Sequence, residues 1–579
     1  MKNLFSVRSH SWMVCAFTVM LLSSCASGND KNLEVTSGTE SCSLPAFIDR
    51  EKFDVENHIF QVDQFGLVIG KPEDDDGDDD VKDGDNDDGE DDDSRDISER
   101  VFSRIINAMG DYEADPEGEP KLKKLLLYFN GGLSDPEGVR RQAERQVPCM
   151  LSDQIFPVFM IWPTGFFASY VEQVIQVRNG RLHRSKKYFT MPFHVIGDIG
   201  QGLVRAPINY ESQARRFFNT KIRIDEEKYY VAATCDLMDQ KDDVTQGDCK
   251  FHNDQEIVGS NANVVFDGDR VDDERSTSLG DVGAIITAPI RLLMLPFVDS
   301  FGKTAWENMV RRTKTSVRRP DEYRHDLHRK EGEEFARRMI ADKQDFPKGL
   351  GGFARFFSML ESCMLDEEPG DGGRERWRCE QSDVTSGARE RLQQAKVTLI
   401  GHSMGTIVIN EVVPHHPKLP YDNIVYMAGA TSIRDTDRAI TPLLERRRGR
   451  TRFFNLSLHP MNDAREQTFG GMAPSGSLLA WIDEMYDKPS TMLDRTIGQW
   501  RHLRVAKHVF SADAQKWMLF RVFNLSSKPD DPTPNPLSHG DFNDDQMKFW
   551  RPSFWGDDRV RWCDSSVDQR PAGDDDACR

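Results

Sequence analysis

Six short apolar runs, separated by segments with helical spacing, constrain the fold of this 579-residue chain more than any other feature. Runs of this length that end in glycine, proline or a polar turn are typical of strands buried on both faces. Strands that alternate with helices predict an α/β fold, with a mostly parallel central sheet and flanking helices. The expected strands lie within residues 123–133, 156–165, 396–401, 423–430, 451–460 and 516–526.

The segments between these runs supply the expected helices. In residues 97–109, Val101, Ile105 and Ile106 fall on one helical face. A segment before this helix, His58 to Gly70, alternates well enough to predict a short strand or hairpin. Further helices are expected over residues 406–413, 477–486 and 490–500.

About 230 residues separate the second expected strand from the third, far more than a crossover between parallel strands requires. An inserted cap or subdomain is therefore expected at about residues 170–390. Its apolar segment 283–298 is too short, and too broken by prolines and an arginine, to span a membrane. Two alternatives stay open for that segment, a cap that lines a pocket or an extra core helix. The charged run 311–343 predicts an exposed pair of helices.

The first 24 residues have the pattern of a secretory signal, with a basic start, an apolar stretch and small residues at its end. The sequence Leu22-Ser-Ser-Cys25 resembles the lipobox of bacterial lipoproteins. The resemblance implies that Cys25 becomes the lipidated first residue. Ala26 behind it favours the outer membrane of the cell envelope. Residues 25–72 are then a tether with a short β segment.

Residues 73–96 form an acidic tract with 16 acidic and 2 basic residues. This tract carries −14 of the formal net charge of −21, so the remainder has an ordinary charge. Such a run cannot bury apolar surface and is expected to be a disordered linker. Asp83, Asp85 and Asp87 have the alternating spacing of calcium ligands, which leaves weak calcium binding open. The sixth position of an EF-hand loop needs glycine, where this chain has Asp88.

Cysteine usage agrees with export, because eight cysteines remain outside the signal and its lipobox. Six of them form near pairs that bracket polar loops, and Cys42 and Cys149 are left to pair with each other. Eight cysteines allow about 105 connectivities, so this pairing is a hypothesis. The near pairs are Cys235–Cys249, Cys363–Cys379 and Cys563–Cys578.

The sequence Gly401-His-Ser-Met-Gly405 lies between the apolar strand Val397–Ile400 and an apolar helix. A nucleophile elbow needs such a strand, small residues two positions on either side of its serine, and a helix directly behind it. The chain here resembles the α/β-hydrolase superfamily, and specifically serine esterases and lipases with a GHSMG elbow. The resemblance implies that Ser403 is the nucleophile, and it covers residues 123–549 without the insertion. The hydrolase domain is expected over residues 97–579.

The order of the superfamily, serine, acid, histidine, implies the remaining partners. Asp463 follows the second strand after the elbow and is the first choice for the acid, with Asp435 after the preceding strand as the alternative. His539, in a loop after the last expected strand, is the expected base. His502 and His508 precede that strand and lie on its wrong side.

The resemblance also implies an oxyanion hole made of two backbone N–H groups. One is that of Met404, directly after the nucleophile. The other comes from Asn130-Gly131-Gly132, where related lipases and esterases often have HGGG. The sequence leaves open whether Gly131 or Gly132 donates.

These features predict a lipid-anchored serine hydrolase that cleaves carboxylic esters, small or lipidic, without a cofactor or metal. The alternative is a non-catalytic envelope protein that uses the hydrolase scaffold for binding. The interspersed acidic residues and the negative net charge argue against a nucleic-acid partner. Redox, nucleotide and zinc-protease functions have no support, because the Rossmann, P-loop and HExxH motifs do not occur.

Overall fold

The computed structural model describes the framework of the sheet and most of the residues expected at the site. The signal sequence with Cys25, the acidic tract and parts of the insertion lie outside the described residues, so the expectations for them stay predictions. The described residues are 42–70, 97–113, 121–175, 177–178, 181–182, 194–207, 209–210, 263–266, 280–318, 350–365, 377–466, 476–487, 489–503, 509–523, 535–556, 560 and 562.

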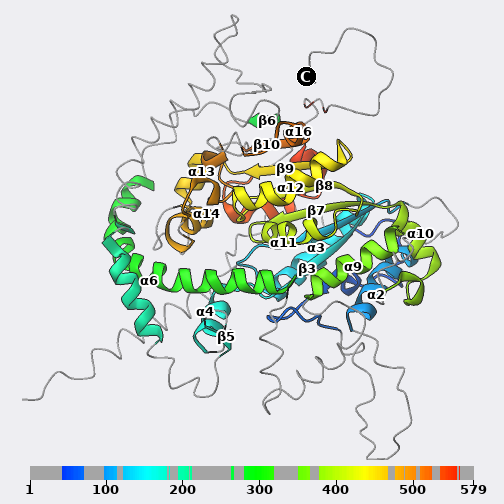
Figure 1. Ribbon diagram of the computed structural model, residues 1–579, viewed down its shortest axis with the longest axis horizontal. Coiled ribbons are helices and arrows are strands. Elements are labelled where there is room, and N and C mark those ends of the chain that lie inside the picture. The colour runs from blue at the N-terminus through cyan, green and yellow to red at the C-terminus, as the bar shows by residue number, and fades with distance from the viewer. Residues whose placement is uncertain are drawn as a thin grey trace, which may run out of the picture.

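One eight-stranded sheet forms the centre of the molecule, and each pair of neighbouring strands in it is parallel (Figure 1). Its strand order is β1-β3-β2-β7-β8-β9-β10-β6. All six expected strands are present, which confirms the α/β fold. The strands are β1 (Ile59–Gln61), β2 (Lys124–Phe129), β3 (Ile155–Ile161), β6 (Asn263–Phe266), β7 (Lys396–His402), β8 (Tyr421–Met427), β9 (Arg452–Ser457) and β10 (Met518–Val522).

Two short strands complete the edges of the sheet, and the first of them confirms the short strand or hairpin expected over residues 58–70. The short strand β1 pairs with β3, with Ile59 opposite Phe159. At the other edge β6, which comes from the insertion, pairs with β10. A separate hairpin of β4 (Val177–Arg178) and β5 (Arg181–Leu182) also belongs to the insertion.

Side chains of the central strands alternate between two covered faces, as the period of a strand requires. On β2, Phe129 packs against Phe353 and Phe357 of helix α9 (Gly352–Leu365), whereas the preceding Tyr128 packs against Phe549 near the C-terminus. The helices that cover these faces are α2 (Ile97–Asp111), α3 (Pro136–Ser152), α9 (Gly352–Leu365), α10 (Ser386–Gln394), α11 (Gly405–Val412) and α12 (Ile433–Arg447). Figure 1 shows α2, α9 and α10 gathered at one end of the sheet.

Shorter helical elements follow the last strands. The helix expected over residues 477–486 is present as α14 with a π-helical continuation η8. The prediction of a helix over residues 490–500 is wrong. There Asp494 accepts hydrogen bonds from Thr491, and Thr496 donates to Asp483, so side chains replace the helical ladder. The elements are α13 (Pro460–Arg465), α14 (Leu478–Trp481), η8 (Ile482–Tyr486), η9 (Met492–Asp494), α15 (Trp500–Leu503), α16 (Ala512–Gln515), η10 (His539–Asn543), η11 (Asp545–Met547) and α17 (Pro552–Trp555), with η1 (Val55–His58), η5 (Cys379–Gln381) and η6 (Val413–His415) earlier in the chain.

The apolar segment of the insertion belongs to one long helix, α6 (Gly280–Thr315), which packs against α4 (Phe166–Ile175). Leu295 on α6 is fully buried in the hydrophobic core. For this side chain the structure therefore favours the core alternative over a pocket lining. None of the described helices combines the length and the apolar character needed to cross a membrane.

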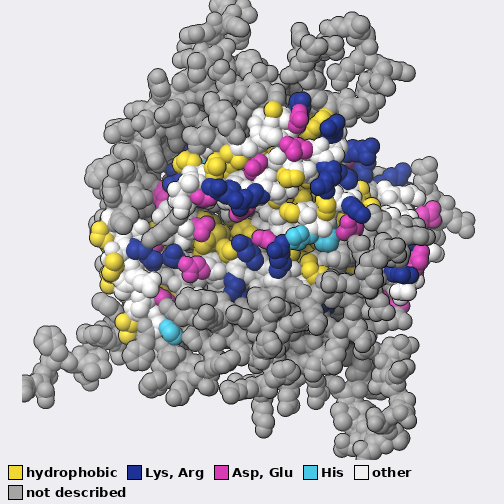
Figure 2. Space-filling view, in the orientation of Figure 1, with side chains coloured by type: hydrophobic (Ala, Val, Ile, Leu, Met, Phe, Trp, Pro, Cys, Tyr) yellow, Lys and Arg dark blue, Asp and Glu magenta, His cyan; other side chains and the backbone are white. Residues whose placement is uncertain are grey.

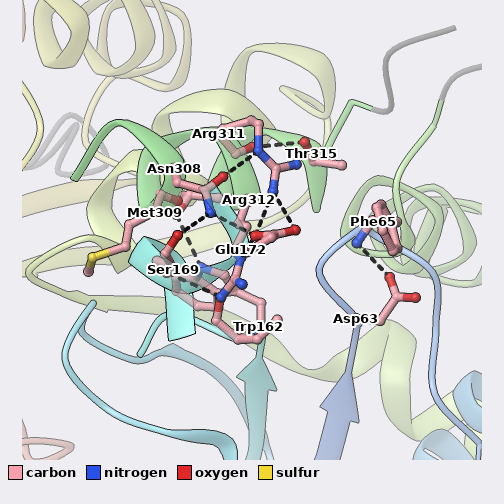
Figure 3. A network of polar contacts seen from close by, with 12 residues as sticks. Asp63, Phe65, Trp162, Ser169, Glu172, Asn308, Met309, Arg311, Arg312 and Thr315 are labelled. Atoms are coloured by element: carbon pink, nitrogen blue, oxygen red, sulfur yellow. Dashed lines mark hydrogen bonds and ion pairs between the residues drawn. The ribbon is translucent and has the colours of Figure 1, made fainter. Parts of the chain in front are cut away.

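The end of α6 carries a buried polar network, so the prediction that residues 311–343 form exposed helices is wrong at its start (Figure 3). Glu172 of α4 accepts from Arg311 at 3.0 Å, from Arg312 at 2.6 Å and from Asn308 at 2.7 Å. The side chains of Glu172 and Arg312 are each 5% exposed. Arg312 can be buried, and Arg311 largely so, because both bind the Glu172 carboxylate, which compensates their charge.

Among the described residues, two disulfides join segments that flank the sheet. Cys42 is bonded to Cys149 and Cys363 to Cys379, which confirms both of these expected pairs. The first ties the N-terminal segment to α3, and the second ties α9 to the turn η5. The other two expected pairs lie outside the described residues.

Charged side chains of both signs are interspersed on the face seen in Figure 2. Hydrophobic side chains show singly or in small groups between them, as they do on ordinary protein surfaces. The densest basic stretch described covers the end of α12 and the turn behind it, with Arg446, Arg447, Arg448 and Arg450.

Candidate active site

Ser403 stands at the turn between β7 and α11, at the carboxyl edge of the sheet. Its φ is +51°, a left-handed conformation that costs a non-glycine residue about 1–3 kcal/mol. Its N–H donates to the carbonyl of Met427 at the end of the neighbouring β8, and its carbonyl accepts from Ala430 at 3.0 Å. The end of β8 and the loop that follows it thus hold both peptide groups that flank the strained residue.

The glycines of the elbow are required by close backbone contact. A Cβ on Gly405 would collide with the carbonyl oxygen of Phe129 in β2. A Cβ on Gly401 would lie 2.9 Å from the backbone nitrogen of Thr406 in α11. The small residues around Ser403 therefore allow strand, turn and helix to pack closely.

The Asn130-Gly131-Gly132 loop leaves β2 beside this turn. The carbonyl of Gly131 accepts from the Asn130 side chain at 3.0 Å, from the Thr164 hydroxyl at 3.2 Å and from the Ser134 N–H at 3.4 Å. Because a trans peptide points its N–H opposite to its C=O, these three donors also fix the direction of the Gly132 N–H. The loop is therefore rigid at this peptide.

The same loop packs directly against the elbow. A Cβ on Gly131 would lie 3.0 Å from Nδ1 of His402 and 3.5 Å from Cβ of Ser403. A Cβ on Gly132 would overlap the Met404 side chain and approach that of Met309 on α6. The N–H groups of Gly131, Gly132 and Met404 make no hydrogen bond to another described residue.

His539 begins the turn η10 and is buried close to the elbow. The Ser538 and Asp541 side chains cap this turn reciprocally. Further along, the carbonyl of Asn543 accepts from Gln146 of α3 at 3.0 Å. His539 thus lies in a short capped turn, and a hydrogen bond to α3 attaches the end of this turn to the flanking helices.

His402, the residue before Ser403, contacts His539 directly. Its Nε2 lies 3.0 Å from the carbonyl oxygen of His539, and the two ring centroids are 5.2 Å apart. Since a carbonyl only accepts, Nε2 of His402 carries the proton. Burial lowers the pKa of His402 to about 4. Burial also lowers the pKa of His539 well below its usual range, and His402 lowers it further, so both rings are neutral at pH 7.

The two aspartates considered for the acid differ in environment. Asp463, in the short helix α13, is buried and accepts from the hydroxyl of Ser477. Asp435 is exposed in the first turn of α12. The structure therefore provides an enclosed environment for Asp463 and not for Asp435.

Glu466 contacts His539 and lies near Asp463. Its Oε2 accepts from the backbone N–H of His539 at 3.0 Å. Burial raises the pKa of Glu466 to about 7, the His539 N–H opposes this rise, and the nearby Asp463 and Asp541 add to it. Glu466 thus connects α13 to the segment that carries His539.

Several polar atoms of this cluster are buried without a hydrogen-bond partner among the described residues. They belong to Ser403, His402 and His539. A closed chain of hydrogen bonds from Ser403 through the His539 ring to Asp463 is therefore not part of this structure. The atoms are Oγ of Ser403, Nδ1 of His402, and Nδ1 and Nε2 of His539.

Two residues of the site were missed by sequence reasoning. His402 was quoted within the GHSMG motif without a role, and Glu466 stood unremarked three residues after Asp463. A buried histidine beside a nucleophile and a second acid one helical turn from the first were signals that could have drawn attention to them.

His502 and Trp162 take part in none of the contacts described above for this cluster. His502 is buried with its Nδ1 3.1 Å from Asp483, and His508 lies outside the described residues. Trp162 is buried, and its indole N–H donates to Thr313 of α6. The described part of the chain contains no group of three or more His, Cys, Asp or Glu side chains arranged to hold a metal ion.

Comparison with protein-family models, with curated proteins and with solved structures found no match to this chain. What the structure establishes is an α/β fold with a parallel sheet and flanking helices, which is compatible with an α/β-hydrolase.

Proposed function

We propose that this chain is a serine hydrolase of the α/β-hydrolase type that cleaves carboxylic esters. The observation that carries the proposal is Ser403, which holds a strained left-handed φ at the carboxyl edge of a parallel sheet. Strain of this kind in a non-glycine residue persists only where the surroundings enforce it, and it clusters at functional sites. Ligands of open α/β sheets also bind at this edge.

In the proposed reaction the Ser403 hydroxyl adds to the carbonyl carbon of the ester, and its proton passes to a ring nitrogen of His539. The alcohol then leaves with that proton, so that an acyl group remains on Ser403. Water repeats the two steps and releases the carboxylic acid. Asp463 would orient the imidazole and stabilise its protonated form, after side-chain rotation brings the two groups into contact.

The negative oxygen of the intermediate needs preorganised donors. The N–H of Met404 at the start of α11 is one candidate. The N–H of Gly132 is the better second candidate, because three donors fix the opposite end of its peptide at the Gly131 carbonyl. In this proposal Asn130 orients the oxyanion hole and does not itself bind the substrate.

A second function remains in competition, a binding protein that keeps the scaffold without catalysis. The observation that favours it is that the Ser403 hydroxyl and both ring nitrogens of His539 have no hydrogen-bond partner among the described residues. A fluorophosphonate probe separates the two functions, because it modifies only an activated serine. Covalent labelling of the wild type that is lost in Ser403→Ala supports the hydrolase. An unlabelled, correctly folded wild type supports the binding protein.

We further propose that the protein is anchored in the cell envelope by lipid on Cys25. The support is the sequence alone, an apolar signal that ends in Leu-Ser-Ser-Cys. Cys25→Ser should release the protein from membranes or block its maturation. A mature N-terminus at any other residue would contradict this anchoring.

A further inference from the structure

We propose that His402 and Glu466 are positioning residues, which hold the backbone of His539 from its two sides and thereby fix the direction of its imidazole. The inference rests on the proposed function in one respect, that the imidazole serves the chemistry at Ser403. The anchoring itself is a physical arrangement that can be tested without any activity.

The first contact binds His539 to the elbow. Nε2 of His402 donates to the carbonyl oxygen of His539 at 3.0 Å, across 137 residues of sequence. Because His402 directly precedes Ser403, this bond ties the expected base to the backbone that carries the expected nucleophile. His402 is 5% exposed, so water competes little for the bond.

The second contact binds the same residue to α13. Oε2 of Glu466 accepts from the His539 N–H at 3.0 Å, across 73 residues of sequence. Glu466 is itself fixed, since its N–H donates to Asn462 and its carbonyl accepts from Gly476, each at 3.0 Å. Above its pKa of about 7 Glu466 is a carboxylate, and a hydrogen bond to a carboxylate is stronger than one between neutral groups.

Together the two bonds restrain both peptide groups that flank one α-carbon. The direction of the Cα–Cβ bond of His539 is then set, and only the two side-chain torsions remain free. Phe542 supports the arrangement, since its ring packs near those of His402 and Phe523. A displacement of about 1 Å at a reacting group can lower a rate about 100-fold, so small losses of anchoring should be measurable.

The chain permits matched variants at both positions. His402→Leu removes the donor, whereas His402→Gln retains an N–H donor at about the place of Nε2. Glu466→Ala removes the acceptor, whereas Glu466→Gln retains an oxygen that accepts from the His539 N–H. Hydrogen–deuterium exchange of the peptide over residues 537–545 reports on anchoring. Hydrolysis of p-nitrophenyl esters reports on catalysis.

The expected result is faster exchange of that peptide in His402→Leu and Glu466→Ala, with near wild-type exchange in both glutamine variants. The kcat of the first two should fall about 100-fold with little change in KM, and the glutamine variants should recover most of it. Should Glu466→Ala fail to fold, His402→Leu carries the test, since the two bonds are separate.

Unchanged exchange in both His402→Leu and Glu466→Ala would overturn the anchoring. Equal kcat in wild type and both truncated variants would overturn the positioning role even if exchange increased. If the wild type hydrolyses no ester and reacts with no fluorophosphonate, while exchange responds as expected, the anchoring stands and the proposed function falls.

Discussion

Two buried polar clusters of this molecule differ in how completely their hydrogen-bonding groups are paired. Between α4 and α6, Glu172 accepts from two arginines and an asparagine, and Arg312 also donates to the Pro163 carbonyl and the Ser169 hydroxyl. At the elbow, the Ser403 hydroxyl and both ring nitrogens of His539 have no partner among the described residues.

The difference indicates that the buried polar groups of the two clusters serve different purposes, one structural and one functional. A buried donor or acceptor left without a partner costs about 1–3 kcal/mol, so most of those in folded proteins are paired. The paired cluster has the organisation of a structural element. Buried polar atoms without a partner also occur elsewhere, as at Ser103 of α2, so they do not mark a functional site by themselves. At the elbow they coincide with the strained backbone of Ser403, and this combination is expected at a functional site. Variants in the two clusters should therefore fail in different ways.

The largest effect is expected at Ser403. If its hydroxyl is the nucleophile, Ser403→Ala should lower kcat for p-nitrophenyl esters by a factor on the order of 10⁶, because the nucleophile and base act as a unit. The fold should survive, as circular dichroism would show, because the change removes one oxygen atom.

Ser103 provides the matched control for this experiment. Its hydroxyl on α2 is likewise buried without a partner among the described residues. Ser103→Ala should therefore keep wild-type turnover. Undiminished turnover in purified Ser403→Ala would end the serine-hydrolase proposal.

The next effect separates the two candidate acids. Asp463→Asn should lower kcat by a factor on the order of 10⁴, as expected for an acid that orients a catalytic histidine. Asp435→Asn should stay close to the wild type, because Asp435 is exposed on α12. Steady-state kinetics of both variants checks the ranking. The reverse ranking would move the acid to Asp435, in the first turn of the helix that follows β8.

The sequence was sufficient for the framework because its signals are local. Each expected strand is one apolar run. Gly401 and Gly405, each two residues from Ser403, indicate that strand, turn and helix pack closely there. The prediction of a helix over residues 490–500 is wrong because Thr496 donates to Asp483, which lies outside that segment. Residue spacing within the segment does not indicate such a contact.

The arrangement around His539 could not be read from the sequence for the same reason. His402 binds a carbonyl 137 residues away and Glu466 an N–H 73 residues away, and backbone acceptors and donors leave no mark on residue type. Arg312 looked exposed because it stands in a charged run. Its partner Glu172 lies 140 residues earlier, on a helix whose packing only the fold determines.

A third prediction concerns the paired cluster. Glu172→Ala leaves Arg311 and Arg312 without their shared carboxylate, and breaking a buried pair in this way costs about 3–5 kcal/mol. Urea unfolding should show this loss of stability. Glu307→Ala is the control, since the Lys303–Glu307 pair is on the surface and removing it should cost at most about 1 kcal/mol. Equal losses in the two variants would show that the buried network adds nothing.

The smallest effect is a pH dependence of stability that arises in the unpaired cluster. Burial raises the pKa of Glu466 from 4.5 to about 7. Between these two values the folded protein keeps a proton that the unfolded chain has lost. The contribution of Glu466 to stability is therefore fully present below pH 4.5 and is lost as pH rises through 7, by at most about 3 kcal/mol.

Glu466→Gln isolates this contribution, because glutamine does not titrate and still offers an oxygen to the His539 N–H. His58, His402 and His539, whose pKa values burial lowers, destabilise both proteins alike as pH falls below 6.5, so their effects cancel in the difference. Urea unfolding at pH 4.5 and pH 8 should show the variant gaining on the wild type at the higher pH. A difference independent of pH would mean that Glu466 is solvated like a surface carboxylate. Water would then reach the cluster at the elbow and could form hydrogen bonds with its unpaired atoms. The two clusters would no longer differ in how completely their polar groups are paired.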